Sequence, residues 1–247
     1  LFACGKCFVE RQHLRDTILT ICDEMNEEDE TGVFKTVLAG SVLALDLIED
    51  GPARKQPKYS NALIRKALRL LDIKTTKYAF RLGEVYEPAF ETVYQEELKK
   101  RIQNKNVHES YSSWLLLLFL AKKNESWALE LADKYWFTDQ TMRVDFFSRL
   151  LKEGEVELIW PEFISEKLKH CLSETSAIEL GQIIIATGPY WHRNKFIDEI
   201  LLSMGDFSWL CQRLEGIYIK VSLSKEGETP LSIKIIPFNI KKNIKIK

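Results

Sequence analysis

The chain has 247 residues, 45% of them hydrophobic, so it can bury a large core in one elongated domain or in two compact ones. Its 35 Lys and Arg nearly balance its 36 Asp and Glu, which excludes an overall charge able to concentrate the whole chain on nucleic acid or an anionic membrane. The most apolar run, Trp114 to Ala121, is much shorter than the roughly 20 residues of a membrane-spanning helix and predicts a buried core helix.

The cysteine content favours a reducing compartment. Five cysteines, an odd number, stand in apolar helical stretches where a thiol packs as a small hydrophobic group. They are Cys4, Cys7, Cys22, Cys171 and Cys211. The chain starts at Leu1 with no signal-peptide pattern, so we expect a cytoplasmic piece of a longer protein.

Apolar residues recur at helical spacing from the start of the chain to about residue 214. The first predicted hairpin of helices surrounds Gly51 and Pro52, because Gly tolerates a left-handed cap and Pro cannot continue the hydrogen-bond ladder. The buried face of the helix before them is predicted to be Phe34, Val37, Leu38, Leu45 and Ile48. Ser60 is expected to cap the helix after them, with apolar residues inward and basic residues toward water. The inward residues are Leu63, Ile64, Ala67, Leu68 and Leu71, and the outward ones are Arg65, Lys66 and Arg69.

The same pattern continues along the chain. Pro88 fits the first turn of a helix, Asn124 fits the cap of another, and Thr138 or Asp139 fits the cap of a third. The positions expected to be buried on these helices are Phe90, Val93, Tyr94, Leu98, Ile102, Trp127, Ala128, Leu131, Ala132, Tyr135, Met142, Phe146 and Leu150. The turns between successive helices are short, which requires antiparallel neighbours.

Three further apolar runs, at residues 164–172, 177–184 and 196–204, extend the helical region to about residue 215. Helices of about 10 to 17 residues joined by short turns predict a mainly α fold of stacked antiparallel helical hairpins, a degenerate HEAT-like α-solenoid. We expect at least nine helices. An irregular globular helical domain is the main alternative. The expected core includes Trp114 to Leu120, Trp127, Leu131, Phe146 and Leu168.

From about residue 216 the apolar period changes to two, which predicts β-strands. The runs 217–223, 231–238 and 239–247 predict a small antiparallel hairpin or a three-stranded meander. Seven Lys and two Glu give residues 216–247 a net charge of +5. We therefore divide the chain into an α-helical repeat-like domain, 1–215, and a short basic β appendage, 216–247.

Sequence motifs give no sign of catalysis. The phosphate-binding G-x-x-x-x-G-K-[ST] and G-x-G-x-x-G motifs do not occur, nor do G-x-S-x-G and H-E-x-x-H. Cys4 and Cys7 have the spacing of a zinc or redox pair, but a structural zinc site needs a second pair nearby, so we favour two core thiols. Glu153 and Glu155 could present paired carboxylates, although a solvated turn explains them without any reaction. Surface or capping roles are expected for His13, His108, His170 and His192. We predict no catalytic residue, cofactor or metal.

One predicted loop carries a candidate contact surface. Gly188 and Pro189 force a turn, and the residues after them bring two aromatic rings, an imidazole and a guanidinium to a helix entrance. These candidate partner-binding residues are Tyr190, Trp191, His192 and Arg193. Aromatic and Arg side chains are typical interface anchors because they lose water readily and still direct hydrogen bonds. In the alternative interpretation, Tyr190 and Trp191 fold back and staple adjacent helices, which predicts a buried Trp191.

Three segments near the start of the chain carry a family resemblance. They are Leu1-Phe2-Ala3-Cys4-Gly5-Lys6, then Val37-Leu38-Ala39-Gly40-Ser41 through Leu47, then Ala62-Leu63-Ile64-Arg65-Lys66-Ala67-Leu68. This order of an apolar helix, a "LAG" helix and a basic amphipathic helix resembles the helical region that follows the NTPase module in bacterial NACHT-type STAND NTPases. The resemblance covers roughly the first 75 residues. It implies a sensor segment of an intracellular antiviral ATPase, whose helical repeats recognise a foreign protein and signal to an oligomerising NTPase. The family's nucleotide-binding motifs would lie upstream of Leu1, and no catalytic residue carries over.

Two kinds of function follow from these observations. The first is a non-catalytic protein-interaction or sensor domain with a protein partner and no membrane contact. The second is a nucleic-acid-binding helical adaptor that uses the basic tail, since phosphate contacts alone can give salt-dependent binding. Lysines on such a tail equally protect an exposed strand edge from aggregation.

Overall fold

A computed structural model of the chain describes residues 2–27, 37–73, 75–103, 107–153, 159, 163, 166, 167, 217–220 and 234–237. The chain divides into two compact units, Leu1–Trp136 and Phe137–Lys247. The predicted division between residues 215 and 216 stays a prediction, because the residues on both sides of it lie outside the described part.

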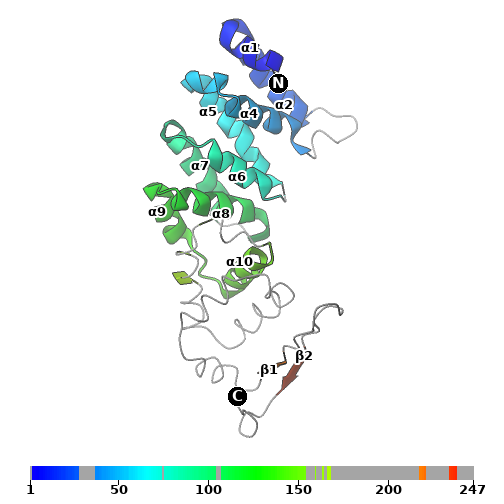
Figure 1. The fold of residues 1–247 in the computed structure, drawn as a ribbon, viewed down its shortest axis with the longest axis vertical. Helices are drawn as coiled ribbons and strands as arrows, with labels where there is room; N and C mark the ends of the chain where they lie inside the picture. The colour runs from blue at the N-terminus through cyan, green and yellow to red at the C-terminus, as the bar shows by residue number, and fades with distance from the viewer. Residues whose placement is uncertain are drawn as a thin grey trace, which may run out of the picture. The chain divides into compact units, whose positions relative to one another are not determined.

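The described residues of the first unit form helices, most of which follow one another after short turns (Figure 1). Its α-helices are α1 Phe2–Glu10, α2 Arg15–Glu27, α4 Ala39–Glu49, α5 Pro57–Ala67, α6 Lys77–Glu84, α7 Glu91–Ile102, α8 Val107–Lys122 and α9 Ser126–Tyr135. Four 3-10 helices join or extend them: η1 Gln12–Leu14, η2 Pro52–Lys55, η3 Leu68–Asp72 and η4 Pro88–Phe90. Helix α4 packs against both α2 and α5, and α8 packs against both α6 and α9.

Helices α4 and α5 form the predicted hairpin, but each begins at a different residue from the expected one. Gly51 has a φ of 87° and lies between the two helices, as the sequence predicts. Leu38 precedes α4 in a left-handed conformation, which leaves Val37 46% exposed rather than on the buried face. Ser60 does not cap α5, because Pro57 already occupies the first turn and the Ser60 hydroxyl donates back to the Pro57 carbonyl at 3.1 Å.

Contacts between α2 and α5 show that these helices run parallel and in register. The Tyr59 hydroxyl lies 3.5 Å from an Asp16 carboxylate oxygen, and Lys66 pairs with Asp23; both contacts join residues 43 positions apart. Because the difference in residue number between contacting residues stays constant along both helices, the two helices must run in the same direction. The antiparallel helix α4 connects them and packs against both.

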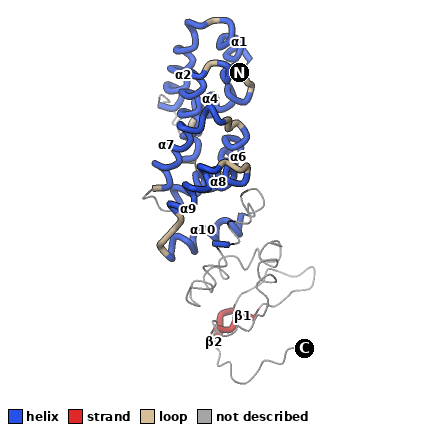
Figure 2. Tube along the Cα trace, turned by 90° about the vertical axis from the view of Figure 1, so that its left-hand side faces the viewer, coloured by secondary structure: helices blue, strands red, loops and turns tan. Residues whose placement is uncertain are grey.

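The next helices repeat this arrangement. Arg65 on α5 pairs with Glu96 on α7, and Arg54 in η2 pairs with Glu87 just before η4, at separations of 31 and 33 residues. Along α6 and α8, Phe80 packs edge-on against Phe119, and Lys123 donates to the Gly83 carbonyl 40 residues away. The first unit therefore has two rows of helices, with α2, α5, α7 and α9 in one and α4, α6 and α8 in the other. Figure 2 shows α2, α7 and α9 along one side and α6 and α8 along the other.

The core of the first unit centres on α8. Trp114 and the leucines from Leu115 to Leu118 are fully buried, as their apolar run predicts. Every apolar position predicted on the helix after Pro88 is also buried, from Phe90 in η4 to Ile102 in α7. Helix α9, the last helix of its row in the first unit, differs from the prediction at Leu131 and Tyr135, which are only half-buried. It buries Trp127, Ala128 and Ala132 as predicted.

The described part of the second unit contains helix α10, Gln140–Glu153, and two short strands, β1 Ile217–Lys220 and β2 Lys234–Pro237. Asp139 caps α10, since its carboxylate accepts a hydrogen bond from the Met142 amide at 3.0 Å. Phe146 and Leu150 are buried, as predicted, whereas Met142 is half-buried. The strands pair antiparallel, with Ile217 opposite Pro237 and Lys220 opposite Lys234. The complete hairpin or meander stays a prediction, because most of residues 216–247 lie outside the described part.

The described chain is therefore mainly α-helical, as predicted. Nine α-helices lie within the described residues up to 153, and no strand is found among the described residues before 217. Helices in the described part are too short or too polar to cross a membrane.

Candidate functional site

The predicted contact loop cannot be compared with the structure, because Tyr190, Trp191, His192 and Arg193 lie outside the described residues. Glu155, His170, Leu168, Cys171 and Cys211 also lie outside them, and the side chains of Cys4, Cys7 and Glu153 are not described. Among the described histidines, His13 and His108 are exposed as predicted, and Cys22 is buried as predicted. The described residues hold no group of three or more His, Cys, Asp or Glu side chains able to bind a metal ion.

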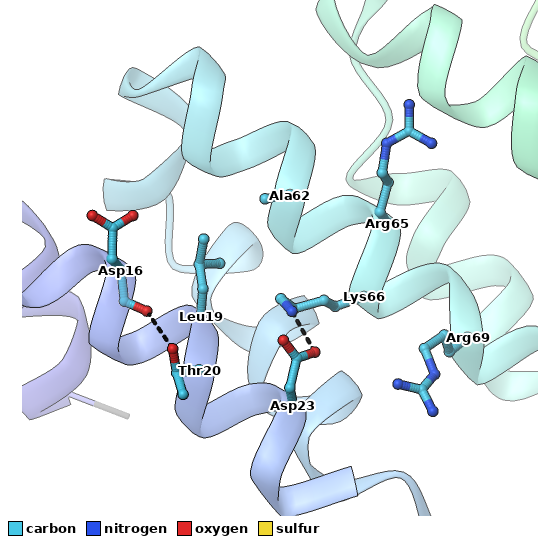
Figure 3. Close-up of a pocket in the computed structure, with 8 residues that line it drawn as sticks. All are labelled: Asp16, Leu19, Thr20, Asp23, Ala62, Arg65, Lys66 and Arg69. Carbon is cyan, nitrogen blue, oxygen red and sulfur yellow. Dashed lines mark hydrogen bonds and ion pairs between the residues drawn. The ribbon is translucent and has the colours of Figure 1, made fainter. Parts of the chain in front are cut away.

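The structure shows a charged groove of about 510 Å³ on the seam between α2 and α5 (Figure 3). Helix α2 lines one wall of it with short or acidic side chains, and α5 with the start of η3 lines the other wall with mainly basic ones. The lining residues are Asp16, Leu19, Thr20, Asp23, Ala62, Arg65, Lys66 and Arg69. We call this feature the α2–α5 groove.

The sequences of the two helices explain why a groove forms here. Leu19 and Ala62 face the same level of the seam, because they share the separation of 43 residues that relates the two helices. Ala62 is too small to fill the space beside Leu19, so both side chains stay partly exposed. From Pro57 to Leu71 the chain has no acidic residue, whereas α2 places Asp16 and Asp23 two turns apart on one face.

An ion pair between Lys66 and Asp23 crosses the groove (Figure 3). The Lys66 side chain is 16% exposed and the Asp23 side chain is 47% exposed, so the pair is open to water on the acidic side only. The Thr20 hydroxyl is engaged within α2, where it donates to the Asp16 carbonyl at 3.1 Å. The pair therefore ties α2 to α5 without closing the space over Leu19.

Arg65 points out of the groove toward α7. Its guanidinium lies 2.6 Å from Glu96 and 3.5 Å from Glu97. Burial alone would raise the pKa of Glu97, but hydrogen bonds from Arg101 and Lys100 outweigh burial and hold that pKa below its usual value. Ion pairs thus close the seam between α5 and α7, and the α2–α5 seam stays open.

The two ends of the groove carry charges that the described residues do not neutralise. Arg69, half-buried at one end, has no carboxylate partner among the described residues. Asp16, exposed at the other end, has no cationic partner there, and its carboxylate accepts only the long contact from Tyr59. Figure 3 shows Arg65 and Arg69 pointing in different directions, so they do not converge on one point. The described lining offers apolar and charged surface and brings no nucleophile and base together.

A second polar cluster outside the groove fixes the end of the helix rows. Trp127 Nε1 donates to the Tyr86 hydroxyl at 2.9 Å, and that hydroxyl donates to a Glu125 carboxylate oxygen at 3.0 Å. Burial raises the pKa of Tyr86 to about 12, with Glu125 adding to the effect and the bond from Trp127 opposing it. Tyr94 packs edge-on against Tyr86 and donates to the Leu82 carbonyl at 2.7 Å. The cluster links α7 to α9 through hydrogen bonds and ring contacts.

The raised pKa of Tyr86 predicts a loss of stability in alkali. An unfolded tyrosine ionises near pH 10, so stability from this group is present below about pH 10 and is lost as the pH rises toward about 12. We expect the urea midpoint of Tyr86→Phe to fall less than that of the unchanged chain between about pH 9 and pH 11.5. Lysine and arginine side chains titrate in the same way in both proteins, so their effect on the urea midpoint cancels in the comparison. Equal falls for the two would contradict this assignment.

Comparisons with family models, curated proteins and solved structures found no match to this chain. The assignment of function therefore rests on its own residues. Sequence reasoning did not find the α2–α5 groove, although two signals for it exist: the two-turn spacing of Asp16 and Asp23, and the absence of acids from Pro57 to Leu71.

Proposed function

We propose that this chain is a non-catalytic protein-interaction module whose helical hairpins stack as a HEAT-like α-solenoid. The observation that carries the proposal is the pair of parallel helix rows. Equivalent helices of successive hairpins are related by separations from 31 to 43 residues, close to the roughly 33 to 47 residues of helical repeats. Contacts run between neighbouring elements, such as α2 with α4 and α5 with α7, which is the pattern of a one-dimensional stack.

Such a stack presents seams between repeats to its surroundings, and repeat proteins use extended surfaces of this kind to bind partners. In this chain the α2–α5 seam is open, carries charges at both ends and has an apolar floor. Those properties suit a surface that recognises a protein segment.

For the biological setting we propose the ligand-sensing helical region of a bacterial NACHT-type STAND NTPase in antiviral defence, in the cytoplasm. Two of the three segments of the resemblance coincide with α4 and α5, and the first lies in α1. Gly40 of the "LAG" segment meets the backbone of α2. The close approach of the two helices requires a residue without a Cβ at this position. This requirement supports the proposal that the "LAG" segment is a specific feature and not a chance run of small residues.

The coding sequence on the N-terminal side of Leu1 tests this setting. We expect a G-x-x-x-x-G-K-[ST] motif in the same reading frame within a few hundred residues. A natural start close to Leu1 would remove the family assignment and leave the interaction module to be judged by binding alone.

Binding is tested by photo-crosslinking in the intact parent protein. A photoreactive residue at Thr20, which lines the groove, should join the chain to one defined protein during the sensing response. The same photoreactive residue at Glu130, exposed on α9, is the matched control away from the groove.

A nucleic-acid adaptor remains the competing proposal, carried by the +5 charge of residues 216–247. Crosslinks to nucleic acid and to no protein would favour it.

A further inference from the structure

We infer that the α2–α5 groove binds a short extended segment of a partner protein that carries a basic residue at one end, an apolar residue in the middle and an acidic residue at the other end. The acidic side chain would meet Arg69, and the basic one would meet Asp16. This inference rests on the proposed interaction function and names the chemistry of the partner.

The register of α2 and α5 sets the length of the segment. Asp16 lies level with Tyr59, and Arg69 is ten residues further along the α5 and η3 chain. At 1.5 Å per helical residue the two charges stand about 15 Å apart along the seam, which an extended peptide spans in about four to five residues. Leu19 and Ala62 lie between these levels, so the side chain in the middle of the segment meets an apolar surface.

The charges around the groove favour such a segment over a polyanion. Acids flank the cations of α5 on both sides, with Asp16 and Asp23 on α2 and Glu96 and Glu97 on α7. A nucleic acid carries a phosphate every few ångströms, so these carboxylates would repel it around Arg69. A segment with one charge of each sign finds a partner for each at the two ends of the groove.

The experiment uses the full chain and two defined pentapeptides. The first is acetyl-Lys-Thr-Leu-Thr-Glu-amide, whose alternate side chains share one face when it is extended. The second has Gln in place of both Lys and Glu. Binding is followed by NMR through the arginine side-chain Nε–H signals. Because the contacts are partly exposed, we expect the charged peptide to bind about two- to fivefold more tightly, with the Arg69 signal shifting most.

Matched variants separate a specific site from general charge. Arg69→Gln and Asp16→Asn should each reduce the preference for the charged peptide, whereas Arg11→Gln and Asp50→Asn remove the same charges at exposed positions outside the groove and should preserve it. Equal affinity for the two peptides overturns the inference, as does a preference that survives Arg69→Gln. An oligonucleotide or inorganic phosphate that shifts Arg69 more than the charged peptide also overturns it. In each of these cases, a protein crosslinked elsewhere on the chain would leave the interaction function standing.

Discussion

Replacing Gly40 with Ala should destabilise the first unit by about 3 kcal/mol or more, although Ala normally favours a helix over Gly by roughly 1 kcal/mol. A Cβ at Gly40 would lie 1.8 Å from the Cys22 carbonyl oxygen and 2.6 Å from its carbonyl carbon. Both atoms belong to the backbone of α2, so no side chain can turn aside to make room. Helices α2 and α4 must separate, which also disturbs the buried Asn26–Ser41 hydrogen bond.

Gly51→Ala is the matched control for this change. Gly51 has open space where a Cβ would stand, and only its φ of 87° opposes the substitution, at a cost of about 1 to 2 kcal/mol. Urea unfolding of the full chain, combined with hydrogen exchange of the α4 amides, measures both variants. A Gly40→Ala protein as stable as the unchanged one would show that α2 and α4 do not approach each other at this glycine.

The spacing of apolar residues correctly predicted the buried face of those helices in which nearly every apolar position faces the core. Helices α7 and α8 show this clearly, since Val93, Tyr94 and Leu98 on the first and the leucine run on the second all face the core. Local patterns failed where a distant segment decides the conformation. Leu38 has a left-handed backbone conformation just before α4, and Gly40 in α4 lies against α2. The periodicity of one helix carries no information about such a contact with another helix. Leu131 has helical spacing on the last helix of its row in the first unit, yet it is only half-buried.

The candidate groove depends on register between helices, which explains why the sequence did not reveal it. Arg65, Lys66 and Arg69 were expected to face water together, yet each has a different setting. Arg65 pairs with α7, Lys66 pairs with α2, and Arg69 faces the open end of the groove. These differences arise from where neighbouring helices place their acids. A search for acids and bases at a constant separation of about 30 to 45 residues would find such pairs in other helical repeats.

Truncating Trp114 to Ala should destabilise the chain by about 3 to 5 kcal/mol, the range for removing a large aromatic side chain from a core. Trp114 is fully buried near the middle of α8, and its ring packs edge-on against Trp136 with centroids 5.7 Å apart. Helix α8 touches α6, α7 and α9, so the cavity would lie where both rows of helices meet. Close packing by these three helices limits how far the core can collapse into the space.

Leu131→Ala is the comparison that shows whether burial, and not the apolar pattern, sets the cost. Leu131 has the same helical spacing as its buried neighbours but is only half-buried, so its truncation should cost about 1 kcal/mol, well below the value for a fully buried leucine. Circular dichroism during urea unfolding follows both variants without depending on tryptophan fluorescence. Equal losses for the two, or a loss below about 1 kcal/mol for Trp114→Ala, would mean that α8 is not the centre of this core.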